Sequence, residues 1–154
     1  MRELEALRPT ITVATVVERE GRFLLVEEET RDGPRINQPA GHLEFGETLP
    51  AAAVRETLEE TGWHVRVTAL VGVYRWEAPD TGATFLRFAF AADAQRHDAT
   101  RTLDVGILRV LWLSYDDLRA QIAAHRSPLV LRCVDDYRAG KRWPVAFVTE
   151  IAPS

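Results

Sequence analysis

The segment GHLEFGETLPAAAVRETLEETGW, residues 41–63, is the most informative stretch of this sequence. Its second half has the signals of a helix. Thr48 is a residue type that caps helix N-termini, Pro50 suits the first turn, and Gly62 stands where a helix ends. The sequence therefore predicts a helix over residues 48–61 that is entered from a loop.

Three glutamates gather on one side of this predicted helix. At about 100° per residue, Glu56, Glu59 and Glu60 fall within one arc, with Arg55 beside them. Their carboxylates repel one another, and two of them occupy the last turn, where the helix dipole favours cations. Arg55 supplies one counter-charge, whereas a divalent metal would supply more. Oxygen-only ligands favour Mg²⁺ or Mn²⁺ over zinc or copper. A solvated acidic face is the alternative interpretation.

The spacing of the segment extends the pattern beyond the helix. Seven of its residues resemble the Nudix box of the Nudix hydrolases: Gly41, Glu47, Arg55, Glu56, Glu59, Glu60 and Gly62. The resemblance implies an α/β (α+β) fold, an αβα sandwich with a mixed β-sheet and a loop–helix–loop catalytic motif. It also implies an enzyme that hydrolyses a nucleoside diphosphate linked to another group, or a related pyrophosphate. One departure is Thr57, because the family usually carries an aliphatic residue there.

The family resemblance also implies a set of metal ligands. Glu56 and Glu60 would bind the metal directly, and Glu59 would be a ligand or the general base. The backbone carbonyl of Ala40, just before the box glycine, would be a further ligand. Such a site lowers the pKa of a water molecule that attacks phosphorus.

The remaining catalytic roles follow from the same resemblance. Arg55 would orient the glutamates, and Glu47 would pair with Arg55 at the entrance of the helix. A carboxylate must take the proton of the attacking water. The candidates for this base are Glu59, Glu44 and Asp104, in that order.

A wider resemblance, from Thr10 to Trp143, points to the NudJ-type phosphatases of bacteria. It implies release of orthophosphate from nucleoside tri- and diphosphates and from the pyrophosphates of thiamine and its hydroxymethylpyrimidine precursor. Attack would then fall on the terminal phosphorus. The segments that carry this resemblance are 12–14, 23–28, 37–44, 85–88 and 126–130.

Four residues outside the box are candidates for substrate binding. Trp76 has the chemistry to stack on a heterocyclic ring, although core packing is its alternative role. Arg87 has the chemistry to clamp a phosphate, and its alternative is a solvent-facing strand position. Arg126 precedes a predicted helix start where an anion can sit. Gln38 would line the mouth of the pocket or complete a turn.

Other functions remain open at this point. Pro79 lies sixteen residues beyond Trp63, a spacing that resembles a marker of ADP-ribose pyrophosphatases and favours that second substrate class. A non-catalytic nucleotide-binding sensor is a third hypothesis, disfavoured because every box glutamate is present. Action on capped RNA is disfavoured by a net charge of −4, from 19 basic and 23 acidic residues.

Composition limits the remaining classes of protein. The 154 residues predict one domain over 1–154. The single cysteine, Cys133, excludes a disulfide framework. The acidic balance disfavours a nucleic-acid partner, and no apolar run is long enough for a membrane span. The charged N-terminal residues 1–7 lack the apolar core of a signal peptide, so we expect a cytoplasmic protein. We expect a monomer or a homodimer, since dimers are frequent among members of the family that the sequence resembles.

The rest of the chain is predicted to consist of strands, loops and two further helices. β-branched and apolar runs predict strands, Gly/Pro/Asn clusters predict loops, and capping residues predict two helices besides the box helix. We expect strands over 10–17, 22–28, 64–76, 84–91 and 107–113, loops over 30–39 and 92–104, and helices over 115–124 and from 128 to the glycine at 140.

Overall fold

The computed structural model describes residues 7–153, and its core is a seven-stranded sheet with the order β3-β2-β1-β6-β5. Two further strands leave this path, since β4 pairs with β1 and β7 pairs with β2. The central pair β1–β6 is parallel and its neighbours are antiparallel. The strands are β1 (Thr10–Arg19), β2 (Arg22–Thr30), β3 (Gly33–Asn37), β4 (Ala40–His42), β5 (Trp63–Glu77), β6 (Thr84–His97) and β7 (Ile107–Ser114). The expected α/β class with a mixed sheet is confirmed.

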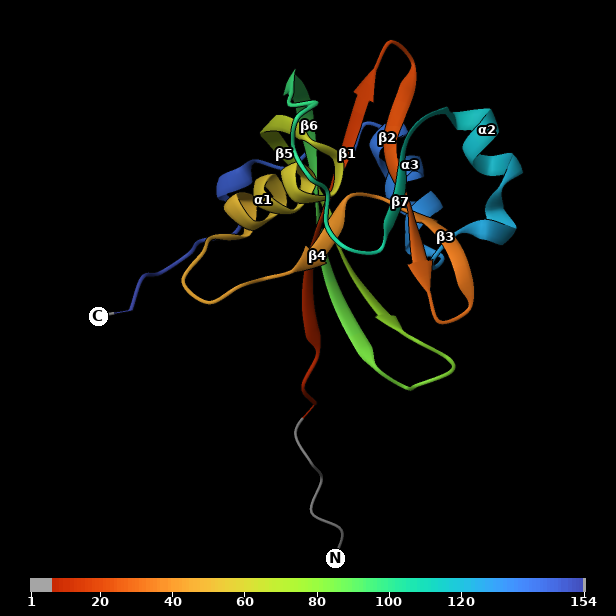
Figure 1. The fold of residues 1–154 in the computed structure, drawn as a ribbon. Coiled ribbons are helices and arrows are strands. Elements are labelled where there is room, and N and C mark those ends of the chain that lie inside the picture. The colour runs from red at the N-terminus through yellow and green to blue at the C-terminus, as the bar shows by residue number, and fades with distance from the viewer. Residues whose placement is uncertain (1–6, 154) are drawn as a thin grey trace, which may run out of the picture.

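Helices cover the sheet on both sides (Figure 1). The helices are α1 (Leu49–Thr61), α2 (Tyr115–Ala120) and α3 (Leu129–Arg138), with short 3-10 turns at Ile122–Ala124 and Val145–Phe147. Side-chain alternation along β6 separates the two layers. Phe90 packs with α1, whereas Ala89 and Ala91 pack with α3. Because neighbouring strand residues point to opposite faces, α1 and α3 lie on opposite sides of the sheet.

Two segments expected to be loops are partly strand. β3 lies within residues 30–39, although Pro34 and Asn37 are turn-forming residues. Pro34 is tolerated because β3 is an edge strand, where a missing N–H breaks no ladder. The second expected loop, 92–104, begins as the end of β6, which pairs with β5 as far as His97. The expected helix over 115–124 is shorter, since α2 ends at Ala120 and a 3-10 turn follows.

Thr57, the residue at which this chain departs from the family pattern, occupies a fully buried position on α1. Its Oγ1 donates to the carbonyl of Ala53 at 2.7 Å. The same oxygen lies 2.8 Å from Oγ1 of Thr15 on β1, which is also fully buried. A polar pair therefore joins α1 to the sheet where an aliphatic contact was expected, and each hydroxyl satisfies the other.

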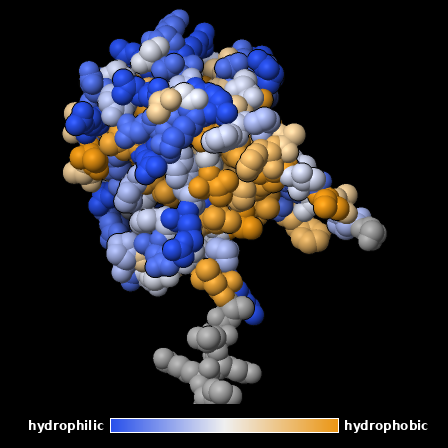
Figure 2. Space-filling model, turned by 180° about the vertical axis from the view of Figure 1, so that it is seen from behind, coloured by the Kyte–Doolittle hydropathy of each residue, from blue (hydrophilic) through white to orange (hydrophobic). Residues whose placement is uncertain are grey.

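Apolar side chains are also exposed, on the side of the sheet that carries α1. Ile11 and Val73 are exposed there, in the same alternation phase as residues that pack with α1. Figure 2 shows apolar side chains gathered on one part of the back of the molecule, within a largely polar face. No helix within residues 7–153 is both long and apolar enough to cross a membrane. The N-terminal segment on which the expected location rests falls largely outside the described residues.

Candidate active site

The box helix begins and ends as its sequence predicts. Oγ1 of Thr48 accepts a hydrogen bond from the N–H of Ala51 at 3.2 Å, and Pro50 stands in the first turn. Gly62 ends the helix in a left-handed conformation, with φ of 76°, and its N–H donates to the carbonyl of Leu58 at 2.9 Å. A side chain would strain this conformation, so the glycine fixes where α1 stops.

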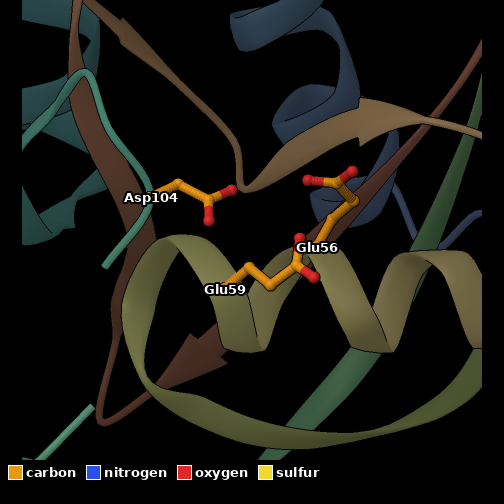
Figure 3. Close-up of side chains that lie close together, drawn as sticks. All are labelled: Glu56, Glu59 and Asp104. Carbon is orange, nitrogen blue, oxygen red and sulfur yellow. The ribbon is translucent and has the colours of Figure 1, made fainter. Parts of the chain in front are cut away.

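Three carboxylates meet at the last turns of α1 (Figure 3). Glu56 and Glu59 from the helix and Asp104 from the segment between β6 and β7 each offer an oxygen, and these oxygens lie within 4.8 Å of one another. The N–H of Asp104 donates to the carbonyl of Glu59 at 3.0 Å, which holds the segment over the helix. Sequence spacing alone relates Glu56 to Glu59, whereas the fold brings Asp104 to them.

Glu60 stands apart from this cluster, in a buried position. Its Oε1 accepts a 2.8 Å hydrogen bond from the N–H of Ala40, so the last turn of α1 is tied to β4. Burial raises the pKa of Glu60 to about 8, against the effect of the Ala40 hydrogen bond. The nearby carboxylates of Glu28, Glu56 and Asp104 raise it further. A cation placed here would relieve the repulsion that these groups exert.

The absence of a side chain at Gly41 lets the carboxylate of Glu56 come close to the backbone of β4. A Cβ built on Gly41 would overlap the carboxylate of Glu56, so a larger residue cannot occupy this position without displacing it. Burial raises the pKa of Glu56, and the hydrogen bond from Arg55 opposes that shift. The carboxylate of Glu56 therefore lies directly against the loop backbone.

Arg55 is the cation that binds the acidic residues together. Its Nε and NH2 donate to the two oxygens of Glu47, at 2.9 and 2.7 Å, in a bidentate pair. Its NH1 donates to Glu56 at 2.9 Å and to Glu59 at 3.1 Å. Glu44, whose side chain is mostly exposed, lies 3.4 Å from the same nitrogen. The hydrogen bond from Arg55 is the largest cause of the lowered pKa of Glu47.

A cavity of about 1150 Å³ opens on the α3 side of the sheet, beside residues 40–48, which comprise β4 and the turn into α1 and are called the box loop. Ala40 and Gly41 line this cavity, and the same two residues lie against Glu60 and Glu56. The carboxylate cluster itself lies next to the cavity and does not line it. The backbone of Ala40 and Gly41 in β4 therefore lies between the cavity and the box carboxylates.

Arg87 lies at the floor of this cavity in a buried position, so the solvent-facing alternative does not hold. Its NH1 donates to Oε1 of Gln38 at 3.0 Å, and its NH2 donates to Oδ1 of Asn37 at 3.2 Å. Gln38 is almost fully buried and donates to the carbonyl of Val130 in α3 at 2.6 Å. Arg87 and Gln38 therefore form one network that joins β6, the chain before β4, and α3.

The other two candidates line the cavity walls. Trp76 on β5 stacks on Phe85 of β6, with 5.8 Å between ring centres and 26° between planes. Together these rings form an aromatic surface beside the cavity. Arg126 donates from NH1 to Oε1 of Glu28 at 2.8 Å, and its side chain is about half exposed. The structure thus places Trp76, Arg87 and Arg126 on the cavity lining. Gln38 is buried in contact with Arg87 and does not line the cavity, so its expected place at the pocket mouth is wrong.

Glu28 is a cavity residue that the sequence analysis did not single out. It lies on β2 between Arg126 and Asn37, whose Nδ2 donates to it at 3.3 Å. A signal existed in the sequence. Leu24 and Val26 are buried in the same alternation phase, and Glu28 continues that phase with a charge.

The chemistry of these donors suits a hard divalent cation. Carboxylate oxygens of Glu56, Glu59 and Asp104 converge, and burial raises the pKa of the box glutamates Glu56 and Glu60. Oxygen donors of this kind bind Mg²⁺ or Mn²⁺ well. The arrangement fits a metal-assisted reaction on an anion held in the adjoining cavity.

Comparison with known proteins identifies this arrangement. The sequence profile of the NUDIX domain matches residues 6–133. The chain belongs to the Nudix hydrolase family. The expected family resemblance is thereby confirmed, and the protein is an enzyme that hydrolyses pyrophosphate linkages in small molecules.

Its relatives include Nudix proteins with a phosphatase name. Phosphatase NudJ of Escherichia coli K12 is 40% identical over 141 residues, which cover 92% of this chain and 91% of that protein. A solved Nudix hydrolase from Nitrosomonas europaea is 45% identical with a TM-score of 0.93, covering 96% of this chain and 100% of that one. An ADP-ribose pyrophosphatase from Streptococcus suis is 17% identical, with a TM-score of 0.66 over 88% and 96% of the two chains. This last likeness shows the Nudix fold alone.

Proposed function

We propose that this Nudix hydrolase releases the terminal phosphate from nucleoside tri- and diphosphates and from thiamine-type or hydroxymethylpyrimidine pyrophosphates. Mg²⁺ is its proposed metal, and Mn²⁺ can replace it. The observation that carries the proposal is the cavity that joins an aromatic wall and a buried arginine to the box loop. The 40% identity to a protein named as a phosphatase supports the same reaction.

The residues divide into three groups along this cavity. Glu56, Glu59 and Glu60, with the carbonyl of Ala40, hold the metal in this proposal. Trp76 stacks on the organic ring, Arg87 and Arg126 bind anionic parts of the substrate, and Gln38 contributes by orienting Arg87. The single domain over 1–154 and a cytoplasmic location belong to the same proposal, as does a monomer or homodimer.

Each protein group has a defined task in the reaction. A bound Mg²⁺ supplies positive charge to the phosphate oxygens and makes a water molecule more acidic. A carboxylate takes the proton of that water in this proposal, and the approach of Glu59 and Asp104 within the acidic cluster supports either of them as the base. Arg55 keeps Glu56 and Glu59 oriented through its 2.9 and 3.1 Å hydrogen bonds. Glu44 is the more exposed candidate for the base.

Hydrolysis of ADP-ribose or of another nucleoside diphosphate linked to a second group is the alternative substrate class. One observation favours it, since Pro79 lies at the tip of the β5–β6 hairpin and lines the cavity. In that case the rings and arginines of the cavity would bind the larger second group. The metal site would be unchanged, because the box residues do not depend on the organic group.

A product-resolved phosphorus NMR assay with Mg²⁺ separates the two classes. The substrates are thiamine diphosphate, hydroxymethylpyrimidine diphosphate, common nucleoside tri- and diphosphates, and ADP-ribose. We expect orthophosphate from the terminal-phosphate substrates, with ADP-ribose left intact. AMP and ribose phosphate from ADP-ribose, with the other substrates intact, would contradict the proposed substrates and leave the hydrolase assignment in place.

A further inference from the structure

Arg87 carries a buried charge that the protein does not neutralise. Only 6% of this residue is exposed. Its two hydrogen bonds go to uncharged amide oxygens of Gln38 and Asn37, and its Nε has no partner. It forms no ion pair with any residue in the described range 7–153. A buried guanidinium without a counter-charge is costly, so its placement at a cavity floor calls for an anionic ligand.

Other arginines of the same cavity differ in this respect. Arg126 pairs with Glu28 at 2.8 Å, Arg31 pairs with Asp80 at 3.1 Å, and Arg132 pairs with Asp136 at 3.1 Å. Their charges are balanced by neighbouring carboxylates, and their side chains reach solvent. Arg35 also lines the cavity and forms no ion pair within residues 7–153, but it is only partly buried and donates to the carbonyl of Pro34 at 2.8 Å. Arg87 is therefore the cavity arginine whose positive charge is both desolvated and available to a ligand.

The position of Arg87 in the sheet defines the order in which the groups around the cavity are arranged. Along β6, Arg87 follows Phe85 by two residues, so both point to the same face. Across the sheet, Arg87 pairs with Thr12 of β1, and Thr12 pairs with His42 of β4 in the box loop. Moving across the sheet from β6 through β1 to β4, one therefore meets first the aromatic rings, then the guanidinium of Arg87, and then the box loop, beyond which the carboxylates lie.

The guanidinium also lies close to the box loop. It is hydrogen-bonded to Gln38, two residues before Ala40, and Ala40 holds Glu60. The order of groups in a diphosphate ester is organic group, inner phosphate and terminal phosphate. The two orders match when the organic group meets the rings, the inner phosphate meets Arg87, and the terminal phosphate meets the carboxylate side.

We propose that Arg87 binds the inner phosphate of the substrate and thereby selects the terminal phosphorus for attack. This inference rests on the proposed function. In the step, the water oxygen bonds to the terminal phosphorus, and a carboxylate takes the water proton. The bond from that phosphorus to the bridging oxygen breaks, and its electron pair stays on the inner phosphate. Arg87 stabilises the negative charge that develops there.

Two variants of Arg87 distinguish the effect of its charge from the effect of its packing. Arg87→Met keeps an extended side chain and removes the charge, and Arg87→Lys keeps the charge but cannot reproduce the planar fork. Arg66→Met is a matched control, because Arg66 is an exposed arginine of β5 that pairs with Asp93 and lies outside the cavity. It removes one arginine charge without touching the site.

The first measurement is the melting temperature of metal-free protein with and without AMP, whose phosphate is the inner phosphate of ADP. AMP should raise the melting temperature of the wild type and of Arg66→Met equally. The rise should be smaller in Arg87→Lys and absent in Arg87→Met. If Arg87→Met does not melt cooperatively, the Arg87→Lys comparison alone decides. A rise of wild-type size in the folded Arg87 variants would overturn the inference.

The second measurement is hydrolysis of ADP with Mg²⁺ in water enriched in a heavy oxygen isotope. Terminal attack places the label in orthophosphate, and inner attack places it in AMP. We expect label in orthophosphate for the wild type. In Arg87→Met, kcat/KM should fall by about 10²-fold, as when one donor to a developing negative charge is removed, and label should appear in AMP. Label in AMP from the wild type would contradict the proposed terminal attack, whereas unchanged labelling and rate in Arg87→Met would contradict the role of Arg87 alone.

Discussion

The backbone N–H of Ala40 donates a 2.8 Å hydrogen bond to Oε1 of Glu60. This contact joins the chain before the box glycine to the last turn of α1. It also leaves Glu60 buried, with one neutral donor and several carboxylates nearby, which is why its pKa rises to about 8. Two consequences of this placement are testable in the protein itself.

Replacing Glu60 with Gln should abolish Mg²⁺-dependent turnover and leave the fold intact. Glutamine keeps an oxygen that can accept from Ala40, so α1 stays tied to β4. The loss should exceed about 100-fold, which is the upper range for residues that only orient metal ligands. Steady-state rates and circular dichroism measure the two effects. Full activity in a folded Glu60→Gln protein would remove Glu60 from the metal site.

The metal-free protein should lose stability as pH rises from about 4.5 to about 8. Within that window the folded state keeps a proton on Glu60, whose pKa is raised, while the unfolded chain has lost it. Unfolding then releases a proton, so the free energy of unfolding falls by at most about 1.4 kcal/mol per pH unit. Urea unfolding in a chelator at several pH values measures this slope. Glu60→Gln should flatten it, and an equal slope in both proteins would contradict the assignment.

Replacing Gly41 with Ala should impair catalysis more than stability. The added methyl group would overlap the carboxylate of Glu56 and displace it from the acidic cluster. A displacement of about 1 Å can cost about 10²-fold in rate. Gly46→Ala is the matched control, because open space surrounds that position and only its positive φ is strained. Equal activities of the two variants would show that Glu56 does not need its present position.

The buried pair of Thr15 and Thr57 should appear as an interaction energy. Thr57→Val removes the acceptor of the Thr15 hydroxyl, and a buried hydroxyl without a partner costs about 1–3 kcal/mol. The double variant Thr15→Val with Thr57→Val removes both groups and should recover part of that loss. Urea unfolding of the four proteins completes the cycle. Additive losses would mean that the two hydroxyls do not stabilise each other.

The box could be predicted from sequence because its relations are local. The cap at Thr48, the end at Gly62 and the clustering of Glu56 with Glu59 all follow from helix geometry within a few turns. Asp104, in an expected polar loop, was also a candidate base, but its contact with Glu59 depends on the backbone hydrogen bond that forms in the folded chain. Only the structure shows which oxygens meet.

Other parts required tertiary information. The residues before β4 look like turn formers, yet pairing with β2 makes Gly33–Asn37 a strand. The alternation of β6 places Arg87 in phase with Phe85, but it does not say which face is covered. Packing of α3 over that face decides that Arg87 is buried. Long-range contacts of this kind leave no spacing signal in a single sequence.

The ion pair between Arg31 and Asp80 has a consequence for how a ligand gains access to the cavity. It joins the tips of the β2–β3 and β5–β6 hairpins, which both line the cavity (Figure 1). Among the ion pairs of the described chain, this solvent-exposed contact is the one that joins the two hairpin tips. An exposed ion pair of this kind stabilises the contact between the tips by about 1 kcal/mol or less, and salt weakens it further. A weak, salt-sensitive contact between two hairpin tips is therefore the tie between these two walls of the cavity.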